Sequence, residues 1–143
     1  MIVHLVFSTK DRELWLTDSI RARAFAYLAE IGRDLGCEVY RVGGMPDHVH
    51  LAVRLPRTLT LADLSQKLKS LSSSWIKREG DHHAGFAWQS GYGAFSLGPS
   101  QLPKLVEYID NQEEHHRKQS FQDEYRRFLE KYGIEFDERY VWD

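Results

Sequence analysis

The 143-residue sequence predicts an α+β fold, in which helices pack on an antiparallel β-sheet. Three observations support this prediction: segments with strand character alternate with segments of helical periodicity, glycine and proline turn signals separate them, and no linker or repeat interrupts the chain. The expected order of elements is β-α-β-β-α-β-α-α, which is ferredoxin-like in outline. We therefore expect a single domain over residues 1–143.

The first strand and the first helix follow from two local patterns. The apolar run Ile2 to Ser8 is rich in β-branched residues and predicts a strand. Apolar residues then recur every three or four positions, which predicts a helix. We expect Thr17 or Asp18 to cap this helix at its start and Gly36 to end it.

A hairpin and a second helix are expected next. The segments Glu38 to Val42 and His48 to Leu55 flank a pair of glycines, and together they predict two antiparallel strands. Thr60, with Asp63 three residues later, forms a capping pattern before a run of apolar residues at helical spacing.

The chain from Phe86 onward predicts more sheet and two more helices. The aromatic and glycine-rich segment Phe86 to Leu97 predicts one or two strands, with a bend at Gly91 or Gly93. Helices are expected over about Pro103 to Arg117 and about Ser120 to Gly133, because proline suits a first helical turn and serine is a favoured cap.

Composition excludes several classes of protein. Hydrophobic residues make up 42% of the chain and charged residues 28%, which excludes a disordered protein. No stretch approaches the ~20 apolar residues of a transmembrane helix, so we expect a cytoplasmic protein. A single cysteine, Cys37, excludes an intramolecular disulfide. The net charge of −2 excludes a basic field over the whole molecule.

Any nucleic-acid surface must therefore be local. Residues 54–78 carry six basic side chains and one acidic side chain, a local balance of +5. The basic residues are Arg54, Arg57, Lys67, Lys69, Lys77 and Arg78. They could contact phosphates, and Trp88, Tyr92 and Phe95 could stack on unpaired bases. An ordinary solvated helix face explains the basic residues equally well, and a sheet core explains the aromatic residues equally well.

The most distinctive local feature is the run Asp47-His48-Val49-His50. Alternate residues of a strand face the same side, so both imidazoles should point one way and Val49 the other. The two Cα atoms would lie about 6.5 to 7 Å apart, which allows both rings to bind one divalent metal ion. We expect Asp47 to face away from the histidines. The alternative is a pair of histidines without a metal, because His-x-His alone is a weak motif.

A second feature lies on the expected third helix. Tyr108 and Gln112 are four residues apart, so they share one helix face. Combined with His48 and His50, they form a coherent set for metal-assisted attack by a tyrosine hydroxyl on a phosphodiester. Considered alone, Tyr108 could instead be an ordinary amphipathic residue at the edge of a core and not a nucleophile.

Several segments in order carry a resemblance to a known family. They are HLVFSTKDR from His4, GGMPDHVHLAV from Gly43, the helix from Leu64 to Trp75, WQSGYGAFS from Trp88, VEYIDNQEEHH from Val106 and the ending ERYVWD. In these segments the sequence resembles the single-tyrosine HUH transposases of the insertion-sequence-200-like family, which includes relatives associated with repeated extragenic palindromes. In that pattern His48 and His50 are the HUH pair. Tyr108 falls at the nucleophile and Gln112 at the third metal ligand.

The resemblance implies an HUH fold and an enzyme that cuts single-stranded DNA, keeps the 5′ phosphate as a phosphotyrosine and rejoins it to a new end. It implies Mg²⁺ or Mn²⁺ as the cofactor, DNA hairpins at element ends as the partner, and a homodimer that shares active sites between subunits. On the same basis Gly98 is a candidate hinge for the tyrosine helix. His116, on the polar face of that expected helix, is a candidate accessory site residue. We also expect a bacterial or archaeal protein that is nucleoid-associated when bound to DNA.

Two other functions stay open. One is a domesticated, non-cleaving module of the same fold that binds DNA or RNA hairpins. The other is a zinc-dependent hydrolase built on His48 and His50, for which Asp47 is the nearest carboxylate in sequence. The transposase is favoured because a pure binding module has no need for Tyr108 and Gln112 beside the two histidines.

Overall fold

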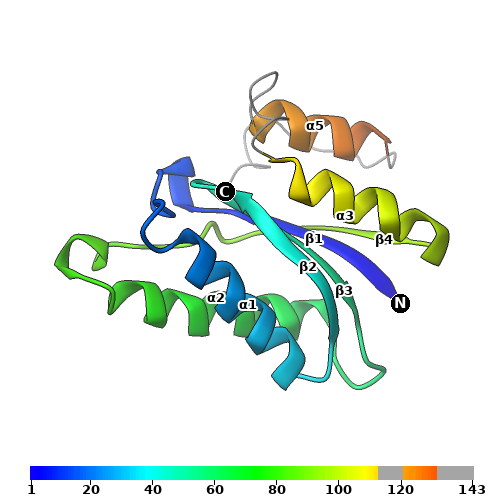
Figure 1. The fold of residues 1–143 in the computed structure, drawn as a ribbon, viewed down its shortest axis with the longest axis horizontal. Coiled ribbons are helices and arrows are strands. Elements are labelled where there is room, and N and C mark those ends of the chain that lie inside the picture. The colour runs from blue at the N-terminus through cyan, green and yellow to red at the C-terminus, as the bar shows by residue number, and fades with distance from the viewer. Residues whose placement is uncertain (113–120, 132–143) are drawn as a thin grey trace.

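The computed structural model describes residues 1–112 and 121–131 (Figure 1). Its strands are β1 (Ile2–Ser8), β2 (Glu38–Met45), β3 (His48–Arg54) and β4 (Gly93–Leu97). Its α-helices are α1 (Arg21–Asp34), α2 (Leu61–Lys77), α3 (Leu102–Asp110) and α5 (Phe121–Lys131). Short 3₁₀ turns lie at Lys10–Arg12, Asp81–His83 and Pro99–Gln101.

The four strands form one antiparallel sheet in the order β2-β3-β1-β4. Helices α1 and α2 cover one face of this sheet, and α3 and α5 lie over the other face (Figure 1). The predicted α+β fold and its ferredoxin-like outline are therefore confirmed. The two central strands, β1 and β3, are buried on both faces because helices cover both sides.

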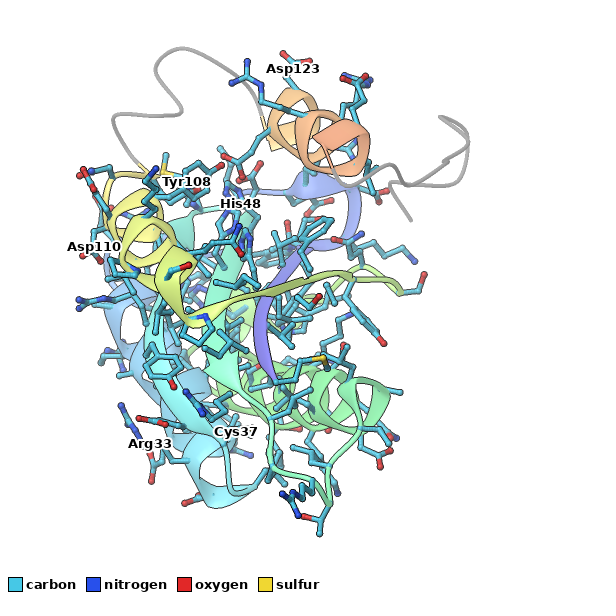
Figure 2. All side chains as sticks on the ribbon, turned by 90° about the vertical axis from the view of Figure 1, so that its right-hand side faces the viewer. Arg33, Cys37, His48, Tyr108, Asp110 and Asp123 are labelled. Atoms are coloured by element: carbon cyan, nitrogen blue, oxygen red, sulfur yellow. The ribbon has the colours of Figure 1, made fainter. Side chains whose placement is uncertain are left out.

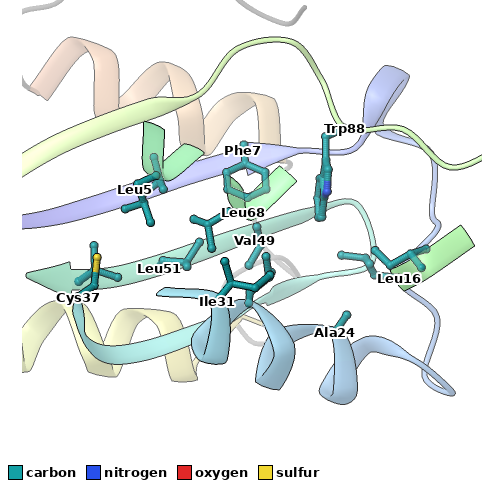
Figure 3. Close-up of a cluster of buried hydrophobic side chains, with 14 of the residues drawn as sticks. Leu5, Phe7, Leu16, Ala24, Ile31, Cys37, Val49, Leu51, Leu68 and Trp88 are labelled. Atoms are coloured by element: carbon teal, nitrogen blue, oxygen red, sulfur yellow. The ribbon is translucent and has the colours of Figure 1, made fainter. Parts of the chain in front are cut away.

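The hydrophobic core lies on the sheet face that α1 and α2 cover (Figure 3). Leu5 and Phe7 of β1 and Val49 and Leu51 of β3 contribute to it, and each is fully buried. Because strand side chains alternate, the residues between them point to the opposite face. That opposite face carries the histidines discussed below.

The expected helix signals are partly confirmed. Thr60 caps α2, since its Oγ1 accepts a hydrogen bond from a first-turn N–H at 3.1 Å. Gly36 follows α1 with a φ of +92°, the left-handed conformation that favours glycine. The prediction that Thr17 or Asp18 caps α1 is wrong. The Thr17 carbonyl, not its side chain, accepts the N–H of Arg21, and Asp18 instead pairs with the Arg21 guanidinium at 2.9 Å.

Only the end of the predicted segment Phe86 to Leu97 is a strand. Trp88 forms a single bridge with Thr9, and β4 starts at Gly93. The intervening carbonyls of Gln89 and Gly91 accept hydrogen bonds from the Lys69 ammonium instead of from a neighbouring strand. The predicted helix limits Arg117, Ser120 and Gly133 lie outside the described residues.

We expect Trp88→Ala to lower the free energy of unfolding by about 3–5 kcal/mol, because it removes a large side chain from the core. The indole N–H donates to Ser72 Oγ at 2.9 Å, and the ring packs edge-on against Phe7 and Phe86 with centroids 4.8 and 5.0 Å away. Urea unfolding measures the change, with the exposed Tyr92→Ala as the control. A loss below about 1 kcal/mol would show that this indole is not a core residue.

Candidate metal and tyrosine site

His48 and His50 lie side by side on the sheet face that α3 and α5 cover. Both are fully buried, and their ring centroids are 5.1 Å apart with the planes at 84°. Val49 between them belongs to the hydrophobic core on the opposite face. The predicted alternation is therefore confirmed, and it brings both imidazoles into one buried polar cluster.

The two ring nitrogens of His48 have different neighbours. Its Nδ1 lies 2.8 Å from Asp47 Oδ1, and its Nε2 lies 3.0 Å from Gln112 Oε1. The expectation that Asp47 faces away from the histidines is wrong. Asp47 belongs to the turn before β3, so the alternation of a strand does not apply to it. A carboxylate on one nitrogen of a histidine fixes the tautomer and directs the other nitrogen toward a ligand.

His50 is held by two residues that sequence reasoning missed. Its Nδ1 lies 2.8 Å from His4 Nε2, with the two rings stacked at 5.0 Å. Its Nε2 lies 2.8 Å from a carboxylate oxygen of Glu124 on α5. His4 is on β1, and the pairing of β1 with β3 could have indicated it. Nothing in the local sequence around Glu124 points to this site.

The donor set fits a divalent metal ion. Ligand atoms of His48, His50 and Glu124 all lie within 4.8 Å of one another, and all three residues are buried. When each imidazole is protonated at Nδ1, its Nε2 atom is an acceptor. The Nε2 lone pair of His48 then faces the Gln112 amide oxygen, and that of His50 faces a Glu124 carboxylate oxygen. Such converging acceptors in a buried site require a proton or a cation between them. Imidazole suits divalent transition metals, and amide and carboxylate oxygens suit Mg²⁺ and Mn²⁺.

Tyr108 lies directly against this cluster. Its ring is edge-on to the His50 ring with centroids 5.6 Å apart, and Figure 2 shows Tyr108 and His48 close together at the inner side of α3. Its backbone carbonyl accepts a hydrogen bond from Gln112 Nε2 at 3.3 Å, which turns the amide oxygen toward His48. Helical spacing therefore places the tyrosine and the amide in the site together.

The environment of the Tyr108 hydroxyl keeps it protonated at neutral pH. Burial raises the pKa of Tyr108 well above its usual value, and the charge and hydrogen bonding of Glu124 raise it further. Hydrogen bonding with Gln112 and the charge of Arg127 lower this pKa by smaller amounts. Chemistry at this hydroxyl therefore needs added positive charge or a proton acceptor beside it.

The predicted basic residues lie in different settings. Arg57, Lys67, Lys77 and Arg78 are exposed. Arg54 is the last residue of β3, where Tyr40 and Glu38 of the neighbouring strand β2 contact its guanidinium. Lys69 is half-buried, and burial lowers its pKa to about 8. Its ammonium binds two backbone carbonyls, so it stabilises the segment after Trp88.

A groove of about 500 Å³ lies between α2 and residues 86–92, on the α1 and α2 side of the sheet. Lys77 and Lys69 line it from the helix, and Tyr92, which is 36% exposed, lines it from the other side. Trp88 also contributes but is only 8% exposed, so most of its surface belongs to the core.

Gly98 and His116 are the two remaining residues of the prediction. Gly98 precedes α3 with φ of −79° and ψ of 159°, an extended conformation that any residue adopts. His116 lies outside the described residues.

We expect Glu124→Gln to raise the dissociation constant for Mn²⁺ by at least about tenfold, because it removes the one formal negative charge of the three-residue cluster and keeps its shape. Isothermal titration calorimetry measures this constant. The matched control is Asp123→Asn, because the neighbouring carboxylate is 62% exposed and pairs with Arg126. Equal Mn²⁺ affinity in both variants would show that Glu124 is not a ligand.

Comparison with known proteins identifies a matching family and two similar solved structures. The model of the family described as transposase IS200 like matches residues 1–112. A crystal structure of a candidate transposase from Deinococcus radiodurans R1 is 25% identical, with a TM-score of 0.62 over 78% of this chain and 90% of that one. A REP-associated tyrosine transposase bound to a REP hairpin is 14% identical, with a TM-score of 0.62 over 80% of this chain and 67% of that one.

No curated protein matches the sequence. Among the described residues, no helix is both long enough and apolar enough to cross a membrane. The family match extends from the first strand through the histidine pair, the tyrosine and Gln112. The chain therefore belongs to the family of IS200-like transposases.

Proposed function

We propose that this protein cuts and rejoins single-stranded DNA through a covalent 5′-phosphotyrosine at Tyr108. The observation that supports this most strongly is the buried contact between the Tyr108 ring and the histidine cluster. Attack by a tyrosine requires one neighbouring group that removes the phenolic proton and another that stabilises negative charge on the phosphate. The cluster contains residues suited to each of these two roles.

The residues of the site divide the chemistry between them. His48, His50, Gln112 and Glu124 would hold Mg²⁺ or Mn²⁺, which when bound supplies positive charge for the scissile phosphate. The Tyr108 oxygen forms a bond to phosphorus while the bond from phosphorus to the 3′ oxygen breaks. The 3′ oxygen takes a proton from water, and the phenolic proton passes to a neighbouring acceptor, for which Glu124 is the adjacent carboxylate.

Asp47 and His4 would act by orienting the two ligand histidines. Each lies 2.8 Å from the Nδ1 atom of its partner imidazole, which leaves Nε2 directed into the cluster. Both ligand rings therefore keep their orientation before a metal ion or DNA binds.

We further propose that the DNA substrate has hairpin ends, because a solved structure of the same fold is a tyrosine transposase bound to a REP hairpin. The exposed cations Arg57, Lys67, Lys77 and Arg78 would contact phosphates. Tyr92 would stack on an unpaired base at the groove beside α2.

The proposed assembly is a homodimer in which α3 of one subunit can serve the histidine pair of the other, with Gly98 as the hinge. A Cβ atom at Gly98 would meet only the Gln101 side chain, at 3.9 Å. The conformation seen here would therefore accept another residue at position 98. A glycine at this position is consistent with a hinge that also adopts a second conformation, in which α3 reaches the other subunit.

We expect Tyr108→Phe to abolish covalent attachment to DNA, because the substitution removes only the attacking oxygen. The measurement uses labelled single-stranded DNA from both flanks of the gene, with Mn²⁺ or Mg²⁺, and a denaturing protein gel. Covalent attachment appears on this gel as a slow-migrating protein band that carries the DNA label. The matched control Tyr27→Phe on α1, which packs near Trp75, should keep this band. A metal chelator added to the wild-type protein should abolish the band.

A labelled band that survives in Tyr108→Phe would contradict the assignment of the nucleophile. A native-gel shift without any covalent band, on flanks that contain both ends, would favour the non-cleaving hairpin-binding module instead.

We expect Lys77→Gln and Tyr92→Ala to weaken DNA binding in different ways. Loss of one phosphate contact should reduce the salt slope of binding by about 0.7–0.9, whereas loss of a stacking ring should cost about 1–3 kcal/mol with the slope unchanged. Fluorescence anisotropy over a salt series measures both, with the exposed Arg33→Gln on α1 as the control. Unchanged binding in both variants would exclude the groove from the DNA interface.

A further inference from the structure

We propose that Gly43 is a positioning residue for the active site. Because it has no side chain, helix α3 approaches the sheet closely enough to place Tyr108 and Gln112 against the histidines. The effect on cleavage rests on the proposed function, whereas the effect on metal binding rests on the geometry of the cluster.

The contact between Gly43 and α3 leaves no room for a methyl group. A Cβ atom at Gly43 would lie 2.7 Å from Ile109 Cγ2 and 3.2 Å from the Ile109 carbonyl oxygen. Real Cβ contacts essentially never fall below 3.0 Å, so the helix or the Ile109 side chain would have to move. Ile109 is 2% exposed, and a close-packed interior gives a branched side chain little space in which to rearrange.

Glycine is needed at this position for space and not for backbone conformation. Among the described glycines, positive φ angles occur at Gly36 and Gly80 only. An alanine at position 43 would therefore keep the strand conformation and conflict only with α3. Gly44 differs, because its added Cβ would meet the backbone of His48 and Val49 within the hairpin.

The position of Gly43 in the sheet couples this contact to the metal cluster. Gly43 pairs directly with His50 in the β2–β3 ladder. Ile109 rests on Gly43, and the next residue, Asp110, pairs with Arg41 of the same strand at 3.2 Å. Strand β2 therefore sets the height of α3 above the sheet.

The functional residues on α3 and just after it extend from this contact toward the histidines. Tyr108 precedes Ile109 directly, and Gln112 follows it by three residues. An outward shift of α3 would move Gln112 Oε1 away from His48 and the Tyr108 ring away from His50. Metal–ligand distances tolerate about 0.2 Å, and a displacement of about 1 Å can slow a reaction about 100-fold.

The test compares Gly43→Ala with the wild-type protein in two measurements. We expect Mn²⁺ affinity to fall about tenfold and covalent cleavage to slow about 10- to 100-fold, with the dissociation constant for single-stranded DNA unchanged. The matched control is Gly85→Ala, where the added Cβ would make an ordinary 3.6 Å contact with Trp15. Cooperative thermal unfolding checks that each variant is folded.

Rescue separates a positioning role from a general loss of stability. Ile109→Leu removes the Cγ2 atom and keeps the apolar volume, so Gly43→Ala with Ile109→Leu should recover most of the lost Mn²⁺ affinity and cleavage. If Gly43→Ala does not fold, the double variant decides, because the proposal expects it to fold and to bind Mn²⁺.

Three outcomes would overturn the proposal: wild-type Mn²⁺ affinity in Gly43→Ala, no recovery in the double variant, or a double variant that also fails to fold. A wild-type protein that forms no covalent product would contradict the proposed function. The Mn²⁺ measurements would still decide the role of Gly43.

Discussion

The complete burial of His48 and His50 is the constraint on which the other features of this face depend. A buried imidazole must have partners for both ring nitrogens, and here each nitrogen has a polar atom within 3.0 Å. These partners come from β1, from the turn before β3, from the segment just after α3, and from α5. The need to satisfy two histidines therefore ties together four separate parts of the chain, and the resulting cluster is suited to a metal ion.

The sheet separates this polar cluster from the part of the protein that provides most of its hydrophobic burial. Successive residues of β3 alternate between the core under α1 and α2 and the cluster under α3 and α5. The face with the proposed active site can therefore carry buried polar groups and a close-packed glycine without interrupting the core. The tyrosine helix contributes one well-buried apolar residue, Ile109, to its own docking.

Predictions from the sequence were correct where the interacting residues are close in sequence within one element, and they were wrong or incomplete where the partners come from outside that element. The capping of α2 by Thr60 involves residues three positions apart, and it was predicted correctly. The orientation of Asp47 was predicted wrongly, because the alternation of β3 was extended by one residue into a turn. Trp88 was considered for base stacking, but its neighbours Phe7 and Ser72 are distant in sequence and place it in the core.

Local spacing along the chain was enough to predict two pairs of site residues: His48 with His50 across two strand positions, and Tyr108 with Gln112 across one helical turn. The residues that complete these pairs follow from how distant parts of the chain pack together. His4 and Glu124 reach His50 from positions 46 residues before and 74 residues after it, and Gly43 meets Ile109 from an edge strand. Periodicity relates residues within one element, whereas these contacts depend on how the helices pack against the sheet.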